Sequence, residues 1–450
     1  MKRYLTLILV LLFSVGILAG CEQLNSDLDE RTDPALNSPN NDADSESANA
    51  DALKAAKLEF KELTALSDQS PEEIDSYLEA LTTIDKNSLD FAEKTLAGDS
   101  SLADKNYIYS PISTWLCYEL LLGGTSGDLA EELKAKLEAN HFAEDSKLDN
   151  LSIFANYCQS DDNSFNIQNL LLISDQLNFK AEYLDYAANF RPLLYQMDLS
   201  RTDELTAALN KLIDEKTAGL IPEFYKEDLN PEIISILMNI TTLDARWETE
   251  FMPEDTAREE FTKSDGSSVT VDMMNQTAAN DMRYAEDDYA QYLRKAYLSG
   301  TSMILILPKD DVSPQEALRH FQNNSEKITF ESYRVELKLP KFTIESNYDL
   351  KELLSKIGLE ELFSPKYGSQ IDLLVEDQEI FIKSSKQAAK IEVFEEGSKA
   401  AAVTTIDFEG ASIAAAEDFI ALHFNRPFAF VIKDPQEICL FEAVVMDPSE

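Results

Sequence analysis

The second half of the chain contains two nearly uninterrupted apolar runs, residues 233–243 and 303–307. Short runs of this kind are typical of strands that are buried on both faces of a sheet. Residues 335–339 alternate apolar and polar side chains instead, which predicts a half-buried strand. Two further apolar segments flank an Asp-Pro-Gln turn, and they predict a hairpin over residues 428–445.

The first half has apolar residues at helical spacing. We predict helices there over residues 51–66, from Pro71 through Leu81, over 88–96, over 111–122 and over 205–220. The segment 111–122 is apolar nearly all round, which indicates a buried helix, and the glycine pair that follows ends it. A later helix is predicted over 348–363, with Asp349 in its cap region. Helices followed by strands, without βαβ alternation or an internal repeat, predict an α+β domain.

The N-terminus has the form of a secretory signal. Lys2 and Arg3 precede a mostly apolar stretch, residues 5–18, that is too short to span a membrane comfortably. The Leu-Ala-Gly-Cys sequence that ends at Cys21 resembles the bacterial lipobox, which implies a signal peptide over 1–20 and acylation of Cys21. We therefore expect a secreted protein that is held at the cell envelope or cell surface by its lipid. An ordinary cleaved signal with a chance cysteine is the alternative.

The chain after Cys21 is divided into three parts. Residues 21–50 are rich in Asp, Asn, Ser and Glu and have few large apolar groups, so we predict a disordered acidic tether. We assign residues 51–84 to a helical N-terminal extension and residues 85–450 to the main domain.

The net charge is strongly negative, with 83 acidic against 39 basic side chains and a formal charge of -44. This balance argues against binding to nucleic acid or to anionic membrane surfaces, because phosphate contact needs basic groups. Membrane contact is therefore expected through the lipid anchor only. The charge favours encounters with basic partners, and a solvated acidic surface with no particular partner is the alternative.

Residues suited to catalysis are scarce. The chain has three histidines, and none has the spacing of a metal-ligand or nucleophile motif. Cys117, Cys158 and Cys439 lie in apolar contexts and are interpreted as buried, inert thiols. We therefore predict no catalytic residue, no metal and no cofactor, and hence no enzyme.

Seven segments, taken in order between Ser88 and Pro448, resemble the serpin family. They are residues 106–113 (an N-x-x-x-S-P-x-S pattern), 210–221, 237–239 with Trp247 and Phe251, 271–276 (V-x-M-M-x-Q), 339–342 (L-P-K-F), 348–350 (Y-D-L) with 357–359, and 424–428 (F-N-x-P-F). The resemblance implies a serpin fold with about nine helices packed on three β-sheets and an exposed reactive-centre loop.

A further segment resembles the hinge of inhibitory serpins. It comprises Glu395, Glu396, Gly397, Ser398, Lys399, Ala400, Ala401, Ala402, Val403 and Thr404. From Ser398 onward, small and apolar side chains occupy one alternating face and end with Ile406 and Phe408, while all three charges up to Glu409 fall on the other face. Because a strand alternates its side chains between faces, this pattern predicts a segment that can become a half-buried strand. An ordinary alanine-rich edge strand is the alternative.

The resemblance implies suicide inhibition of serine, and also of cysteine, endopeptidases. A protease would attack the loop and form an acyl-enzyme, and the freed hinge would insert into the main sheet and trap it. Counting fourteen residues beyond Gly397, as inhibitory serpins usually require, places the reactive bond at Ala411–Ser412 and favours an elastase-like target. Bonds at 413–414 or near Phe408 are the alternatives, and the latter would suit a chymotrypsin-like enzyme.

The resemblance also implies a polar shutter beneath the main sheet and a breach at its end. Ser110, Ser113, Asn239 and Gln387 would form the shutter, with Gln387 where the family often has histidine, and Trp247 would lie at the breach. We expect a monomer whose partner is the target protease. The competing hypotheses are a non-inhibitory serpin-fold binding protein and an unrelated surface lipoprotein with enzymatic or solute-binding activity.

Overall fold

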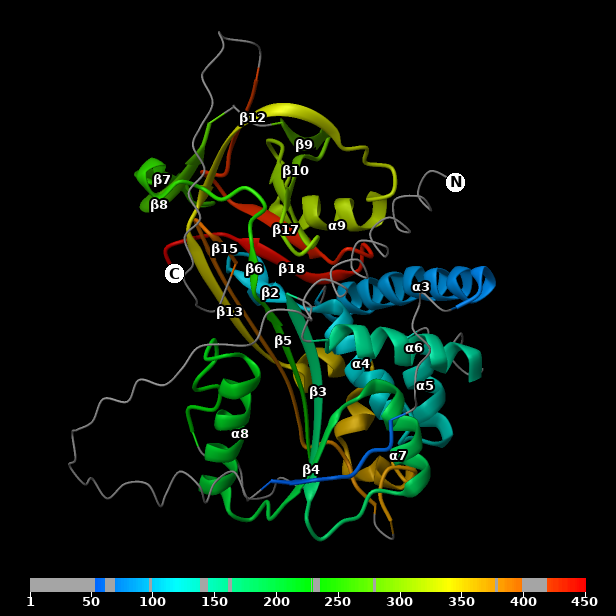
Figure 1. Ribbon diagram of the computed structural model, residues 1–450. Coiled ribbons are helices and arrows are strands. Elements are labelled where there is room, and N and C mark those ends of the chain that lie inside the picture. Colours follow the sequence, from blue (N-terminus) through cyan, green and yellow to red (C-terminus); the bar gives the residue numbers. More distant parts are fainter. Residues whose placement is uncertain are drawn as a thin grey trace, which may run out of the picture.

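The computed structural model describes residues 53–60, 69–96, 99–137, 145–160, 164–227, 229, 235–277, 281–376, 379–398 and 419–450 (Figure 1). The predicted signal peptide, Cys21 and the tether lie outside the described residues. The same is true of residues 399–418, which include the second part of the predicted hinge and the predicted reactive bond.

An eight-stranded sheet forms the centre of the fold. Its order is β1 (Lys54–Ala55), β4 (Leu193–Met197), β3 (Phe165–Ser174), β5 (Ser235–Leu243), β14 (Ser384–Phe394), β15 (Gly397–Ser398) and β6 (Ala245–Arg246), with β13 (Phe342–Asp349) also paired to β14. The described part of the predicted strand 233–243 is β5, which is buried on both faces as predicted. The neighbours β5 and β14 run parallel, from Ser384 opposite Ile236 to Ala389 opposite Thr241.

Helices cover both faces of this sheet (Figure 1). The helices α4 (Pro111–Leu122), α5 (Gly127–Leu137), α6 (Asp145–Cys158) and α7 (Ala181–Ala187) lie on one face, and α8 (Thr202–Lys216) lies on the other. Helix α4 is buried over its whole circumference, which confirms the prediction for 111–122. The glycine after it is required by close approach, because a Cβ at Gly123 would lie 2.0 Å from the Tyr186 ring. Helix α8 forms a separate apolar core with β3 and β5.

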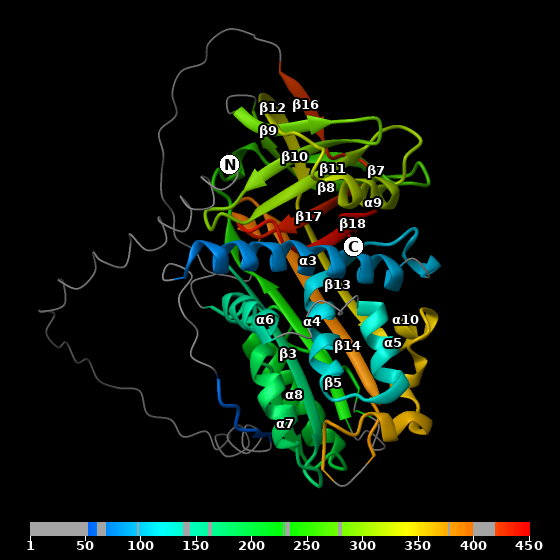
Figure 2. The same ribbon diagram turned by 90° about the vertical axis from the view of Figure 1, so that its right-hand side faces the viewer.

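A ten-stranded sheet packs at one end of the central sheet (Figure 2). It contains β2 (Tyr107–Tyr109), β18 (Cys439–Val445), β17 (Phe428–Lys433), β11 (Ser302–Pro308), β10 (Ala290–Ala296), β9 (Asp281–Glu286), β12 (Glu331–Pro340), β8 (Ser268–Gln276), β7 (Ala257–Thr262) and β16 (Ile420–His423). Strand β12 pairs with β9 along its first half and with β8 along its second half, so it joins two smaller sheets into one. The predicted C-terminal hairpin is confirmed as β17 and β18.

Two predictions for the N-terminal extension were wrong. The part of 51–66 that the structure describes contains no helix; Lys54 and Ala55 pair with β4 as an edge strand. The edge strand β4 has unpaired backbone N–H and C=O groups, and pairing with them was favoured here over the helix that the apolar spacing predicted. The helices predicted near 71–81 and 88–96 are a single helix, α3 (Pro71–Leu96), because no glycine or proline interrupts it. Since α3 crosses the boundary predicted after residue 84 and buries Ile84 and Phe91, the extension shares the core of the main domain.

The helix predicted over 348–363 is shorter than expected. Strand β13 continues to Asp349, which caps α10 (Leu350–Lys356) by accepting hydrogen bonds from the backbone N–H groups of Lys351 and Glu352. Gly358 follows with φ +90°, a backbone conformation that favours glycine and ends the helix. The described residues contain eight α-helices in total, and none of these helices is long and apolar enough to cross a bilayer.

Candidate functional site

The hinge forms a short wedge in the central sheet. After β14 ends at Phe394, the chain turns back, and β15 lies between β14 and β6. Ser398 is opposite Val393 on one side and Ala245 on the other, in antiparallel register. Farther along the sheet β14 pairs directly with β5, with no strand between them. The sheet is therefore opened for two residues only.

The two wedge residues are tightly enclosed. A Cβ at Gly397 would lie 2.2 Å from the carbonyl oxygen of Ala245, so only glycine fits without displacing the backbone. The Ser398 side chain is fully buried, and its Oγ lies 2.7 Å from the hydroxyl oxygen of Tyr297. The face of the chain that contains Ser398 is therefore turned toward the core at this point.

A segment that follows β6 fastens the hinge from the side. The Trp247 backbone N–H donates to the Glu396 carbonyl at 2.9 Å, and the Phe251 N–H donates to the Glu395 carbonyl at 3.0 Å. The Trp247 indole N–H donates to the Phe394 carbonyl at 3.1 Å, and its ring stacks on Tyr297 at 4.1 Å between centroids. Trp247, which was predicted to lie at the breach, is thus bonded directly to the residues that precede the wedge.

Glu395 forms an ion pair at the base of the hinge. The Lys341 ammonium lies 2.8 Å from one of its carboxylate oxygens, and the Thr256 hydroxyl donates to the other at 2.9 Å. Burial alone would raise the pKa of Glu395, but the hydrogen bonds it accepts, that from Lys341 foremost, leave the pKa below its ordinary value. The charged form of Glu395 is therefore favoured in the folded state.

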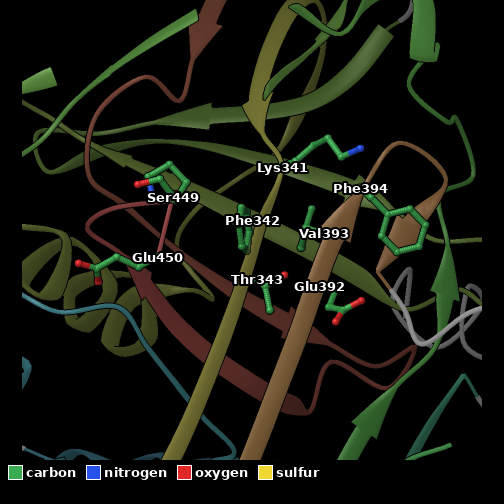
Figure 3. A pocket seen from close by; sticks show the side chains of 9 residues that line it. Lys341, Phe342, Thr343, Glu392, Val393, Phe394, Ser449 and Glu450 are labelled. Carbon is green, nitrogen blue, oxygen red and sulfur yellow. The ribbon is translucent and has the colours of Figure 1, made fainter. Parts of the chain in front are cut away.

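A pocket of about 450 Å³ lies beside this ion pair, between the ends of β13 and β14 and the C-terminal residues (Figure 3). Its lining comprises Lys341, Phe342, Thr343, Glu392, Val393, Phe394, Pro448, Ser449 and Glu450. No histidine or cysteine lines it, and the Ser449 hydroxyl donates to Asp447 rather than to a general base in the pocket. The pocket therefore offers no nucleophile with a partner to activate it.

The predicted shutter residues lie deep beneath the point where β5 and β14 pair. The Gln387 side-chain amide donates to the Ser110 carbonyl at 3.0 Å and to the Thr114 hydroxyl at 2.6 Å. The Ser113 hydroxyl accepts from Thr241 at 2.6 Å. These bonds connect the N-terminus of α4 to β14 and to β5, which are neighbouring strands of the central sheet.

Asn239 occupies the centre of this region. It lies opposite Gln387 in the β5–β14 register and opposite Asn169 in the β3–β5 register. Its buried side-chain amide has no hydrogen-bond partner among the described residues. The structure therefore brings the four predicted shutter residues to one place, although only two of their side chains are hydrogen-bonded.

Several residues of the site were missed by sequence reasoning. Thr114 and Thr241 bond to the shutter, and Tyr297 bonds to the wedge, yet none of them stands in a recognisable pattern. Lys341 lay inside the L-P-K-F segment, but its pairing with Glu395 connects residues that are far apart in sequence. Long-range pairs of this kind leave no periodic signal.

Residues that could support catalysis or metal binding lie elsewhere. His320 bonds to Asp287 at 2.9 Å, and His423 bonds to Glu336 at 2.7 Å. In the part of the chain that the structure describes, no group of three or more His, Cys, Asp or Glu side chains is placed to hold a metal ion. Cys117, Cys158 and Cys439 are buried and unpaired, and burial raises their thiol pKa values.

The fold defines a class of protein in which a short strand, β15, lies between β14 and β6 of a central sheet that helices cover on both faces. Comparison with known proteins identifies the family. A family model described as Serpin (serine protease inhibitor) matches residues 86–448. The chain belongs to the serpin family, whose members inhibit proteases and are typically not enzymes.

Known relatives cover most of the chain. A serine protease inhibitor of Mus musculus is 30% identical over 372 residues, which are 77% of this chain and 84% of the relative. Serpin I2 of Homo sapiens is 26% identical over 360 residues, covering 77% of this chain and 88% of that protein. Among solved structures, the thermophilic serpin tengpin in its native state has a TM-score of 0.72 at 21% identity, covering 88% of this chain and all of that one. This last likeness shows the shared fold.

Proposed function

We propose that this protein inhibits serine endopeptidases, and also cysteine endopeptidases, as a suicide substrate whose reactive bond is Ala411–Ser412. This mechanism is supported by the position of the wedge residues Gly397 and Ser398 between β14 and β6. Farther along the same strand, β14 pairs directly with β5. A cleaved loop would extend this wedge. Its backbone would then hydrogen-bond to β14 on one side and to β5 on the other. Two ladders would replace the single ladder that joins these strands now.

The existing registers define where each inserted residue would go. If the pairing continued from Ser398 along both flanking strands, Ala400 would lie between Ile391 and Leu243, which are buried. In the same register Asp407 would lie between Ser384 and Ile236, which already face each other in the β5–β14 pairing. The two ladders therefore agree over the whole length, and no bulge is needed for the strand to enter.

The side chains suit those positions. Ala402 would lie between Ala389 and Thr241 on the core-facing side, where a larger group would be blocked. Lys399 would lie on the outer face between Glu392, which is partly exposed, and Asp244, which is exposed. The small residue at 402 and the charged residue at 399 would thus suit the faces that they would occupy.

The proposed chemistry uses the protease's own machinery. The protease nucleophile attacks the Ala411 carbonyl, the peptide bond to Ser412 breaks, and the Ser412 amine leaves with a proton. An ester, or a thioester for a cysteine enzyme, then joins Ala411 to the protease. Insertion of the freed hinge carries this acyl-enzyme away before water completes hydrolysis. The small residue at 411 favours an elastase-like target.

The test mixes the purified protein with elastase-, chymotrypsin-, trypsin-, subtilisin- and papain-like enzymes. We expect a covalent band that survives SDS with an elastase-like enzyme, and a released peptide whose mass corresponds to residues 412–450. A peptide that begins at residue 414 or just after Phe408 would move the reactive bond to one of the alternatives. Cleavage by all five enzymes without any covalent band would contradict the proposal.

We also propose that the chain is secreted and anchored through acylated Cys21. The support is the Leu-Ala-Gly-Cys sequence behind a basic and apolar N-terminus. Labelled fatty acid should appear in the protein expressed in a bacterium, and Cys21→Ala should abolish the label and release the protein from the membrane fraction. Label that persists in Cys21→Ala would refute acylation at this residue.

A further inference from the structure

Lys295, on β10, is a lysine inside the protein. Lys295 is only 6% exposed, although lysine is rarely buried without a charged partner. Its ammonium donates to the Thr249 carbonyl at 2.8 Å and to the Gln276 side-chain oxygen at 3.1 Å. It also lies 5.0 Å from the centre of the Trp247 ring and 4.4 Å from that of Phe251. Lys295 therefore contacts two aromatic faces in a water-poor site.

These contacts are to the segment that holds the hinge. Trp247 and Phe251 donate backbone hydrogen bonds to the two glutamates that precede the wedge, and Thr249 lies between them in sequence. Lys295 donates a hydrogen bond to the carbonyl of Thr249. Its neighbour Ala296 accepts a hydrogen bond from the Glu248 N–H at 2.9 Å. The segment 247–251 is thus held between the end of β10 and the hinge.

We propose that Lys295 is a positioning residue for hinge release: separation of segment 247–251 from the hinge admits water to the Lys295 ammonium and is accompanied by proton uptake. This inference rests on the proposed insertion of the loop. Acid would favour the open hinge, and alkali would hold it closed. The proton would be bound by Lys295 itself, so the effect disappears when this residue cannot titrate.

The surroundings of Lys295 explain the direction of this pH dependence. Burial lowers the pKa of Lys295 to about 7 in the closed state, and the charge of Glu248 offsets part of that effect. The other charged groups around the segment are engaged elsewhere: Arg246 pairs with Glu250, Lys341 with Glu395, and Arg294 with Glu437. Glu396 carries the remaining charge at the hinge. Among the described residues, no carboxylate forms an ion pair with Lys295.

The sign follows from proton linkage. A hydrated lysine has a pKa near 10.5, so the open state retains its proton between pH 7 and 10 while the closed state loses it. The closed state is therefore stabilised progressively as the pH rises above 7. The population of the open hinge should fall by up to about tenfold for each pH unit in this range, and it should be constant below pH 7.

The experiment measures hinge opening without any protease. Ser398→Cys places a thiol at a fully buried position, and its modification by methyl methanethiosulfonate, followed by peptide mass mapping, requires the hinge to leave. The same rate is measured in Ser398→Cys/Lys295→Met, and the ratio of the two rates cancels the intrinsic pH dependence of the thiol. We expect this ratio to fall from pH 7 to pH 9 by roughly tenfold to a hundredfold. A ratio that does not change with pH overturns the proposal.

A second readout keeps Lys295 in place, in case the methionine variant does not fold. The chain has two tryptophans, so Trp115→Phe leaves Trp247 as the only indole reporter. Its emission should titrate near pH 7 and should not do so in Trp115→Phe/Lys295→Arg, because arginine keeps its charge. Absence of this titration in Trp115→Phe contradicts the proposal. Both readouts are independent of inhibition, so either one can fail while covalent complexes still form.

Discussion

The hydroxyl oxygens of Ser398 and Tyr297 lie 2.7 Å apart, and both side chains are buried. Through its backbone Ser398 belongs to the central sheet, whereas Tyr297 directly follows β10 of the ten-stranded sheet. This hydrogen bond therefore fastens the hinge at the junction of the two sheets. Insertion of the loop would begin at this anchored residue. Because the Ser398 side chain faces the core, its orientation defines which of the following side chains would also face the core.

Substitutions on alternate faces should have opposite consequences. After the proposed insertion, Ala400 would lie between buried Ile391 and Leu243, and Ala401 would lie beside Lys390 and Thr242, which are partly exposed. Ala400→Glu would bury an unpaired carboxylate at a cost of several kcal/mol, so we expect cleavage by the protease without a covalent complex. Ala401→Glu is the matched control and should retain the complex. Equal inhibition by both variants, measured as complex formed per molecule consumed, would falsify the proposed insertion.

Cleavage within the loop should stabilise the protein. An inserted strand adds a second ladder of backbone hydrogen bonds, and at roughly 0.5–1.5 kcal/mol each a dozen such bonds supply on the order of 10 kcal/mol. The melting temperature of the nicked protein should therefore exceed that of the intact protein by about 10 °C or more. Differential scanning calorimetry of the two forms measures this difference. Identical melting temperatures would show that nothing was inserted.

Thr404 should matter only after cleavage. After the proposed insertion it would lie between Gln387 and Asn239, and the buried side-chain amide of Asn239 has no hydrogen-bond partner among the described residues. Thr404→Val should therefore lower the stability of the nicked form by about 1 kcal/mol and leave the intact form unchanged. Thr405→Val is the control, because residue 405 would lie beside the apolar Met238 on the other face. A loss of equal size in both variants would argue against the register.

The Glu395–Lys341 pair should contribute stability that depends on pH. The pKa of Glu395 is lowered in the folded state from its ordinary 4.5, so its contribution is present above that pH and is lost as the pH falls through the folded value. Wild type should melt above Glu395→Gln at pH 7, and the difference should shrink as the pH falls below about 4.5. A difference that stays constant over this range would assign the effect to packing instead of charge.

The acidic surface should accelerate encounters with cationic proteases. With 83 acidic and 39 basic side chains, the chain attracts basic partners over distances that salt screens. We propose that its targets include basic elastase-like enzymes. Their association rate constant should fall by about tenfold between low and physiological ionic strength in stopped-flow measurements, while that of an acidic protease should not. Rates that hardly change with salt would remove electrostatic steering from the proposal.

Much of the fold was predictable because it depends on local pattern. The buried helix 111–122, the strand alternation at Val335, Leu337 and Leu339, and the C-terminal hairpin all follow from apolar spacing that is readable over a few residues. The ordered series of family motifs predicted the fold as a whole. By contrast, residues 53–60 have helical spacing but include an edge strand, because the unpaired backbone of β4 lies in reach only after folding.

By itself, the sequence determined the periods of the elements and the two faces of the hinge, since both depend on neighbours along the chain. Only the tertiary structure decided which residues hold that hinge. Tyr297, Lys341 and Lys295 are remote in sequence from the residues they restrain, and each contact arises where separate sheets meet. Their burial, which gives those contacts their strength, exists only once the chain has excluded water from the junction.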